Sequence, residues 1–182
     1  MVPFAHDPIT LEAGVGLARA ISLHGMRTPS LKEIGEAMGA SVPTVHRWLG
    51  GGQQRLARVV GGHLGTIIDV MRDRTAARGA AGFMPCRDIE LFPIRTLLAF
   101  EEIGRSDDSV AEQVAEAWRD LRVILGNTIR RSDVGREAVV LRGLWASICD
   151  GHAPMTLDDA RQIWAAEVAS RQVAPRQEGG RV

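Results

Sequence analysis

One segment, residues 41–48 with the sequence Ser-Val-Pro-Thr-Val-His-Arg-Trp, places two hydroxyls, an imidazole and a guanidinium on what is predicted to be a single short helix. Arg47 and His46 can donate hydrogen bonds to guanine edges or phosphates, and Thr44 can bind a phosphate. The valine and proline side chains add apolar surface that can touch a thymine methyl group. We predict that the exposed side of this segment contacts double-stranded DNA through Val42, Pro43, Thr44, His46 and Arg47.

Two short predicted helices, and the turn between them, position that segment. Ser30 is a favourable N-cap for the first helix, and Glu33, three residues later, completes a capping box. Gly39 ends this helix, because glycine adopts the left-handed conformation of a helix C-cap without strain. Ser41 caps the second helix, and Pro43 lies in its first turn, where proline is tolerated. This order of elements is typical of a helix-turn-helix.

Apolar side chains predict that the two short helices pack against each other: Leu31, Ile34 and Met38 on the first, Val45 and Trp48 on the second. A supporting helix is predicted before the pair, over about residues 8–24. A glycine triplet at 50–52 separates the pair from a longer helix that begins near Gln53.

The rest of the chain also has helical periodicity, so we predict an all-α fold. The alternation of apolar and polar residues that marks a half-buried strand is hard to find. A loop is expected at residues 78–85 because of its glycine and proline content. The four helices expected after it cover about residues 88–105 (with Pro93 as a place for a kink), 108–130, 135–149 and 157–171.

The charge is balanced, with 22 basic and 22 acidic residues, which argues against a histone-like binder. Residues 1–60 carry six basic and four acidic groups, a mild excess that points this part toward a polyanion. No window is apolar enough for a membrane span and no secretory signal is visible, so a cytoplasmic protein is expected. Cys86 and Cys149 are interpreted as small buried apolar residues, with a thiol sensor as the alternative.

No catalytic signature is present. The sequence has no glycine-rich phosphate loop, nucleophile elbow or HExxH motif, and no paired histidine and cysteine spacing for a metal. The histidines, at positions 6, 24, 46, 63 and 152, are too scattered along the sequence to indicate a site. We therefore predict no catalytic residues, no metal and no cofactor, and a protein that is not an enzyme.

The N-terminal part resembles the TetR (tetracycline-repressor-like) family of bacterial transcriptional regulators. The resemblance rests on the ungapped stretch Gly25-Met-Arg-Thr-Pro-Ser-Leu-Lys-Glu-Ile-Gly-Glu-Ala-Met-Gly-Ala-Ser-Val-Pro-Thr-Val-His-Arg-Trp-Leu49, which has the family's Gly-x-Ser turn and the pattern of its recognition helix. It implies that Val42, Pro43, His46 and Arg47 face bases. It also implies that phosphates are gripped, or the recognition helix braced, by Ser30, Ser41, Thr44 and Trp48.

The sequence departs from the family pattern at two kinds of position. His46 and Trp48 stand where tyrosines are common, and Gly52 stands where a lysine often contacts a phosphate. The missing lysine implies weaker DNA binding with a flatter salt dependence. The alternative function is therefore a helical ligand-binding or protein-interaction module whose degenerate helix-turn-helix no longer binds DNA. A small helical enzyme that uses a buried histidine or cysteine is a further alternative, but no base–nucleophile pair can be named for it.

The C-terminal part extends the resemblance, since residues 140–151 are similar to the penultimate helix of family ligand domains. A mostly apolar cavity between helices is the usual form of a small-molecule site. We predict such a cavity, for an apolar or aromatic effector, lined by Phe92, Phe100, Trp118 and Trp145. The predicted domains are DNA-binding (1–52) and ligand-binding and dimerisation (53–172), followed by a disordered tail (173–182).

The last two predicted helices resemble the pair that forms a four-helix dimer bundle in this family. Their apolar residues are Val139, Leu144, Trp145 and Ile148 on one helix and Ala160, Ile163, Trp164 and Val168 on the other. A homodimer is expected on physical grounds too, because one short recognition helix reads few bases and a two-fold pair reads a palindrome. The resemblance implies a repressor whose effector changes the spacing of the two DNA-reading heads.

Overall fold

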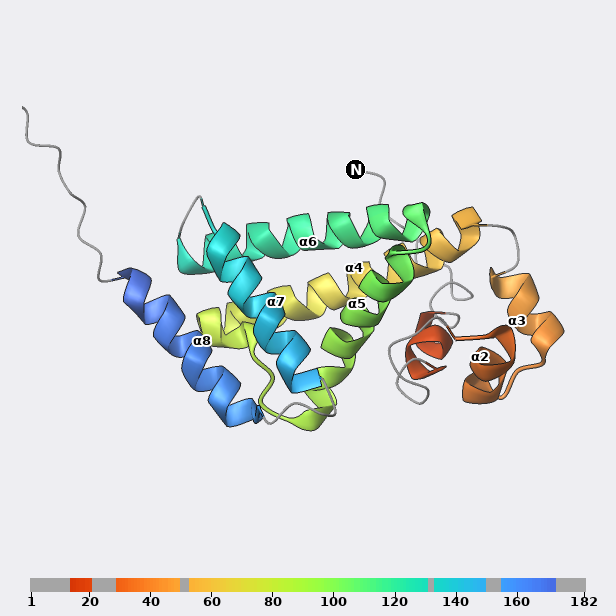
Figure 1. Cartoon of the computed structure of the whole chain (residues 1–182), viewed down its shortest axis with the longest axis horizontal. Helices are drawn as coiled ribbons and strands as arrows, with labels where there is room; N and C mark the ends of the chain where they lie inside the picture. The colour runs from red at the N-terminus through yellow and green to blue at the C-terminus, as the bar shows by residue number, and fades with distance from the viewer. Residues whose placement is uncertain (1–13, 21–28, 50–52, 131–132, 150–154, 173–182) are drawn as a thin grey trace, which may run out of the picture.

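The computed structural model describes residues 14–20, 29–49, 53–130, 133–149 and 155–172. Every regular element in these ranges is a helix and none is a strand, which confirms the predicted all-α fold. Figure 1 shows an elongated arrangement with the two short helices at one end and the last helix at the other. Within the described ranges, no helix is both long and apolar enough to cross a membrane.

The two short helices are α2 (Leu31–Met38) and α3 (Val42–Leu49), and their predicted caps are confirmed. The Oγ of Ser30 accepts a hydrogen bond from the backbone N–H of Glu33 at 3.3 Å, and the backbone N–H of Ser30 donates to Glu33 Oε2 at 2.7 Å. Gly39 ends α2 in the left-handed region, at a φ of 63°. The expected supporting helix is described only at residues 14–20, which are helical, and the glycine triplet and the tail lie outside the described residues.

A long helix, α4 (Gln53–Arg78), runs beside α6 (Asp108–Ile129) along the length of the molecule (Figure 1). It also contacts α3 and α5 (Leu91–Gly104). Its buried apolar side chains recur at helical spacing and form a continuous core with α5 and α6: Val59, Val60, Leu64, Ile67, Ile68 and Met71. Helix α4 is thus packed against both the short-helix end and the larger helical part.

The segment between α4 and α5 differs from the expected loop and single helix. Residues Gly79–Phe83 form a 3-10 helix, and a second 3-10 turn covers Asp88–Glu90. Helix α5 begins only at Leu91, so Pro93 lies in its first turn, where the missing N–H breaks no helical hydrogen bond. The loop expected at 78–85 is therefore mostly a 3-10 helix, and the helix expected from about residue 88 is present but starts as a 3-10 turn.

Two buried tryptophans hold the first 3-10 helix in place. Helices α7 (Gly135–Cys149) and α8 (Leu157–Gln172) have the predicted bounds to within one residue. The indole N–H of Trp145, on α7, donates to the carbonyl of Phe83 at 3.0 Å. That of Trp164, on α8, donates to the carbonyl of Ala80 at 2.7 Å. Each indole buries a large apolar surface and satisfies its one donor, which is the arrangement a core tryptophan requires.

The two glycines Gly39 and Gly65 should respond oppositely to alanine. At Gly39 the positive φ makes any Cβ strained, so Gly39→Ala should lower the free energy of unfolding by about 1–2 kcal/mol. A Cβ at Gly65, inside α4, meets no atom within 4 Å, so Gly65→Ala should raise it by up to about 1 kcal/mol. Urea titrations followed by tryptophan fluorescence measure both, and a stabilising Gly39→Ala would contradict the turn conformation.

Candidate nucleic-acid interface and ligand cavities

The outward face of α3 carries the side chains predicted to face bases. Val42, Pro43, His46 and Arg47 are all exposed, and Val45 between them is fully buried. Trp48 is half-buried and packs against the hydrophobic core, which fits the bracing role that the resemblance implies. The helix therefore has an exposed side, with His46 and Arg47 beside the two apolar residues of the first turn, and a buried side.

The hydroxyls at the start of α3 are engaged in capping. Ser41 Oγ accepts the backbone N–H of Thr44 at 3.3 Å and lies 2.9 Å from Thr44 Oγ1. Arg47 Nη2 donates to the same Thr44 oxygen at 3.5 Å, a long contact on an exposed side chain that a stronger acceptor can replace. Ser30 is similarly occupied by its capping box. These serines primarily shape the helix starts, and Arg47 has donors free to turn outward.

Close packing behind α3 fixes its orientation. Ile34 on α2 and Val45 on α3 are buried in the same core. A Cβ on Gly35 would lie 2.6 Å from the carbonyl oxygen of Ala40, so the chain after the turn passes directly over α2. The predicted contact between the short helices is confirmed in its central residues. Leu31 and Met38 are only partly buried.

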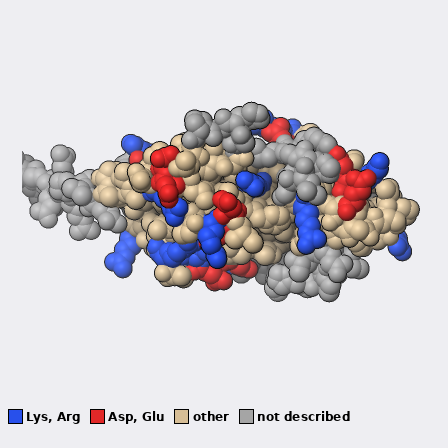
Figure 2. Space-filling model, turned by 90° about the horizontal axis from the view of Figure 1, so that it is seen from below, with Lys and Arg blue, Asp and Glu red and all other residues tan. Residues whose placement is uncertain are grey.

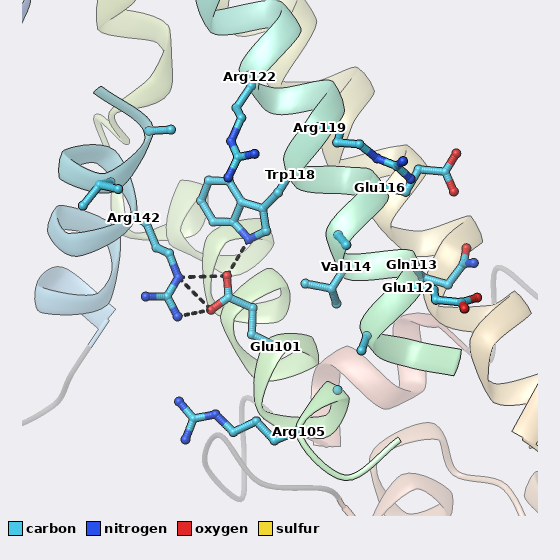
Figure 3. A pocket seen from close by; sticks show the side chains of 15 residues that line it. Glu101, Arg105, Glu112, Gln113, Val114, Glu116, Trp118, Arg119, Arg122 and Arg142 are labelled. Atoms are coloured by element: carbon cyan, nitrogen blue, oxygen red, sulfur yellow. Dashed lines mark hydrogen bonds and ion pairs between the residues drawn. The ribbon is translucent and has the colours of Figure 1, made fainter. Parts of the chain in front are cut away.

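A groove of about 850 Å³ crosses α5, α6 and α7, and is here called the α5–α7 groove (Figure 3). Its centre is Glu101, which accepts the indole N–H of Trp118 at 2.5 Å and the Nε of Arg142 at 3.0 Å. The hydrogen bonds and charge of Glu101 raise the pKa of Arg142. Arginines 105, 119 and 122 also line it. The α5–α7 groove is thus a charged surface around one half-buried tryptophan.

A second, smaller cavity of about 270 Å³ lies between α4 and the start of α5, and is here called the α4–α5 cavity. Its walls include Ile67 and Val70 on α4 and Phe92 and Pro93 on α5. His63 and Arg74 also line it. Neither of these two polar residues was singled out from the sequence. Their spacing with Ile67 and Val70, all on one face of α4, is the signal that locates them once α4 is known to be helical.

The four aromatic residues predicted to line one ligand cavity lie in different places. Phe92 lines the α4–α5 cavity and Trp118 lines the α5–α7 groove. Phe100 and Trp145 are fully buried in the core, with the Trp145 ring centroid 5.8 Å from that of Trp118. The structure therefore does not bring the four residues together in one cavity. Sequence spacing cannot tell which aromatic side chains are buried in the core and which line a cavity.

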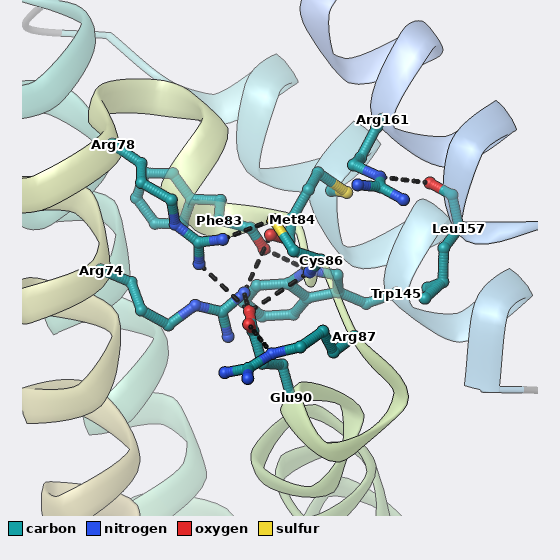
Figure 4. A network of polar contacts seen from close by, with 10 residues as sticks. All are labelled: Arg74, Arg78, Phe83, Met84, Cys86, Arg87, Glu90, Trp145, Leu157 and Arg161. Atoms are coloured by element: carbon teal, nitrogen blue, oxygen red, sulfur yellow. Dashed lines mark hydrogen bonds and ion pairs between the residues drawn. The ribbon is translucent and has the colours of Figure 1, made fainter.

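A cluster of charged side chains surrounds Glu90, at the end of the segment between α4 and α5 (Figure 4). Arg74 and Arg78 lie 2.9 Å and 3.1 Å from Glu90 Oε2, and Arg87 lies 3.4 Å from Oε1. Burial by itself raises the pKa of Glu90. The hydrogen bonds from the Cys86 N–H and from Arg78, with the arginine charges, outweigh this, so its pKa is lowered. Three guanidiniums around one carboxylate leave an excess of positive charge at this end of the α4–α5 cavity.

The two cysteines do not both behave as buried apolar residues. Cys86 is exposed, and its Sγ accepts a hydrogen bond from Arg78 at 2.5 Å. Cys149 is half-buried, and burial raises the pKa of its thiol to about 11. The expectation of burial was wrong for Cys86. Its backbone N–H donates to Glu90 Oε2 at 3.2 Å, which fixes the turn between α4 and α5 with the Cys86 side chain exposed.

Eight apolar residues were expected to contact a second copy. Four of them are buried within this chain: Leu144, Trp145, Ala160 and Trp164. Val139 is 72% exposed and Ile163 is 44% exposed, which leaves them free to contact another molecule. Ile148 and Val168 are half-buried against the core. Any apolar contact made by the outer faces of α7 and α8 therefore centres on fewer residues than the sequence pattern indicated.

Glu90→Gln should destabilise the protein in a pH-dependent way. A carboxyl whose pKa is lowered by folding adds stability that is present above its unfolded value of about 4.3 and is lost as the pH falls through the folded value. The deficit of Glu90→Gln relative to wild type should thus be largest at pH 7 and shrink toward pH 3.5 in urea titrations. Glu102→Gln, which breaks only an exposed 3.2 Å bridge to Arg105, is the matched control, with almost no deficit. A deficit of Glu90→Gln that stays constant with pH would contradict the role of its charge.

The comparisons with known proteins add one finding. No family model and no curated protein matches this chain. Among solved structures, a transcriptional regulator from Rhodococcus sp. Rha1 is similar over 91% of this chain and 99% of its own, with a TM-score of 0.66 and 14% sequence identity. The arrangement of helices is therefore the fold of a protein described as a transcriptional regulator.

Proposed function

We propose that this chain is a DNA-binding transcriptional regulator of the TetR type, a ligand-responsive repressor that binds a palindromic operator as a homodimer in the cytoplasm. In this proposal residues 1–52 bind DNA and residues 53–172 bind the effector and form the dimer. The observation that carries it is the exposed polar face of α3, with Arg47 and His46 outward and Val45 anchored behind them.

The dimensions of α3 suit the major groove. An α-helix with its side chains is about 10–12 Å in diameter, and the groove is about 12 Å wide, so α3 can lie in it. The guanidinium of Arg47 can donate two parallel hydrogen bonds to a guanine, and His46 can donate one to a base edge or a phosphate. Val42 and Pro43 lie at the start of the helix, where a recognition helix meets base edges.

The distribution of surface charge favours DNA binding through a few contacts near α3 over binding through a broad basic surface. On the face shown in Figure 2, basic and acidic side chains of the described residues alternate over the surface, and no large area carries one sign. The formal net charge of the whole chain is zero. Few phosphates are then neutralised per subunit, so the affinity for DNA should fall gently as salt rises.

Two copies are required for specificity. One recognition helix contacts a few base pairs, whereas a two-fold pair contacts half-sites about 34 Å apart and reads them together. Val139 and Ile163 are exposed apolar residues on α7 and α8 that a second copy would cover. An effector that binds better to one spacing of the two DNA-reading ends would then shift the dimer on or off its operator.

Selection of sites from a random duplex library tests the DNA-binding proposal. Wild type should enrich a palindrome at low salt. Arg47→Ala should bind that palindrome about 30-fold more weakly or worse, because the dimer loses one guanine contact of about 1–3 kcal/mol in each of two half-sites. Arg72→Ala, which changes an exposed arginine on α4 that pairs with Asp69, should bind the palindrome as tightly as wild type. Absence of any enrichment would favour the alternative, a ligand-binding or interaction module with a degenerate helix-turn-helix.

Sedimentation velocity tests the dimer. Ile163→Asp should move the population toward monomer, because it places a charge in an apolar contact. Val123→Asp makes the same change at a residue of α6 that is 61% exposed, and it should leave the dimer intact. A wild-type protein that stays monomeric at micromolar concentration would overturn this part of the proposal.

A further inference from the structure

The α4–α5 cavity is lined mainly by apolar side chains, with His63 toward the N-terminal end and Arg74 toward the C-terminal end of its α4 wall. Its volume of about 270 Å³ lies just below the range of about 300–1,000 Å³ typical of drug-sized ligands. The occupant is therefore a molecule of one or two rings. His63 and Arg74 both line the cavity, eleven positions apart on one face of the same helix.

His63 is the polar group at one end. It is 7% exposed, and its Nδ1 is buried with no hydrogen-bond partner among the described residues. Its ring packs edge-on against Phe92 and Phe100, with centroids 6.5 Å and 6.1 Å away. Burial lowers its pKa to about 4, so the imidazole is neutral at pH 7 and has one N–H and one lone pair. A hydroxyl satisfies either nitrogen, because it both donates and accepts.

Arg74 is the polar group at the other end. Its Nη2 donates to the carbonyl of Met84 and pairs with Glu90, each at 2.9 Å. Its Nε and Nη1 are buried with no partner in the described part of the chain. Burial lowers the pKa of Arg74, and the charge of Glu90 offsets this only in part. Two orphaned donors and the positive excess around Glu90 are the conditions that a carboxylate would satisfy.

The other polar residues of the cavity are already paired. The Thr66 hydroxyl donates to the carbonyl of Gly62 at 3.3 Å, and Glu90 is held by its three arginines. His63 and Arg74 are thus the groups left to recognise a ligand.

We propose that the α4–α5 cavity binds a small aromatic monocarboxylic acid that carries a hydroxyl at its far end, with the carboxylate on Arg74, the ring between the walls and the hydroxyl on His63. That this acid is the effector rests on the proposed function, whereas its binding here does not. The fixed charge of Arg74 refines the sequence-based expectation of an apolar or aromatic effector.

His63 also connects the cavity to the N-terminal part. A Cβ added to Gly14, in the helix at residues 14–20, would lie 3.2 Å from both Nδ1 and Cβ of His63. The imidazole is therefore packed between that helix and the cavity. A ligand that shifts the His63 ring acts directly on the helix that precedes α2, which is a route by which occupancy can change the position of α3.

Isothermal titration with four probes at pH 7.5 tests the site: naphthalene, 2-naphthol, 2-naphthoate and 6-hydroxy-2-naphthoate. The hydroxyl should improve affinity about 2- to 10-fold, the value of one neutral hydrogen bond, and the carboxylate about 10-fold or more. 6-Hydroxy-2-naphthoate should bind most tightly, at one molecule per chain. Equal affinities for all four probes, or no binding at all, would overturn the proposal.

Two variants assign the ends of the ligand. His63→Phe should remove the gain from the hydroxyl alone, and Arg74→Lys, which keeps the charge beside Glu90, should reduce the gain from the carboxylate alone. Retained naphthalene binding shows that each variant is folded around the cavity. Arg119→Ala, an exposed residue in the α5–α7 groove, should change none of the four affinities. If Arg119→Ala abolishes binding, or if His63→Phe keeps the hydroxyl gain, the site has been placed wrongly.

A final arm separates this inference from the proposed function. Release of the selected duplex by 6-hydroxy-2-naphthoate from wild type, with His63→Phe needing about 2- to 10-fold more acid, would identify the acid as an effector. Tight binding of the acid without any selected DNA would leave the site intact and overturn the regulator. Selected DNA without binding of any probe would overturn the site and leave the regulator intact.

Discussion

The structure depends on the burial of one helix against two sets of partners. Helix α4 packs along α6 and α5 through its apolar residues, and its first turns contact α3 at the short-helix end. Apolar burial is the main favourable term in folding, so this shared core determines where the short helices lie relative to the larger part. A displacement of α4 should therefore also displace α3, because densely packed interiors transmit displacement and do not absorb it.

Polar contacts fix the segment between α4 and α5 against the same core. The indoles of Trp145 and Trp164 bind its carbonyls from α7 and α8, and Glu90 gathers three arginines around its end. Backbone without regular secondary structure must have its polar groups satisfied in this way when it is buried. Because the segment is fixed, the start of α5 stands at a defined distance from α4, and the α4–α5 cavity exists between them.

The N-terminal elements were predictable because their signals are local. The capping box of Ser30 and Glu33 and the left-handed Gly39 depend on residues within one turn of each other, and each was found where the pattern indicated it. The 3-10 helix at Gly79–Phe83 was not predictable in the same way. Its glycines indicate a loop, and its conformation depends on tryptophans more than sixty residues away along the chain.

Sequence alone thus determined the all-α class, the caps and turn of the short helices, and the exposed polar set on α3, since these follow from helical periodicity and from contacts between near neighbours. Tertiary structure alone decided which aromatic residues are core and which line a cavity, and it placed Cys86 at the surface. It also left buried nitrogens of His63 and Arg74, beside one cavity, without a partner among the described residues. The physical reason is that burial and hydrogen-bond satisfaction depend on which helix faces meet, and residues distant along the chain decide that.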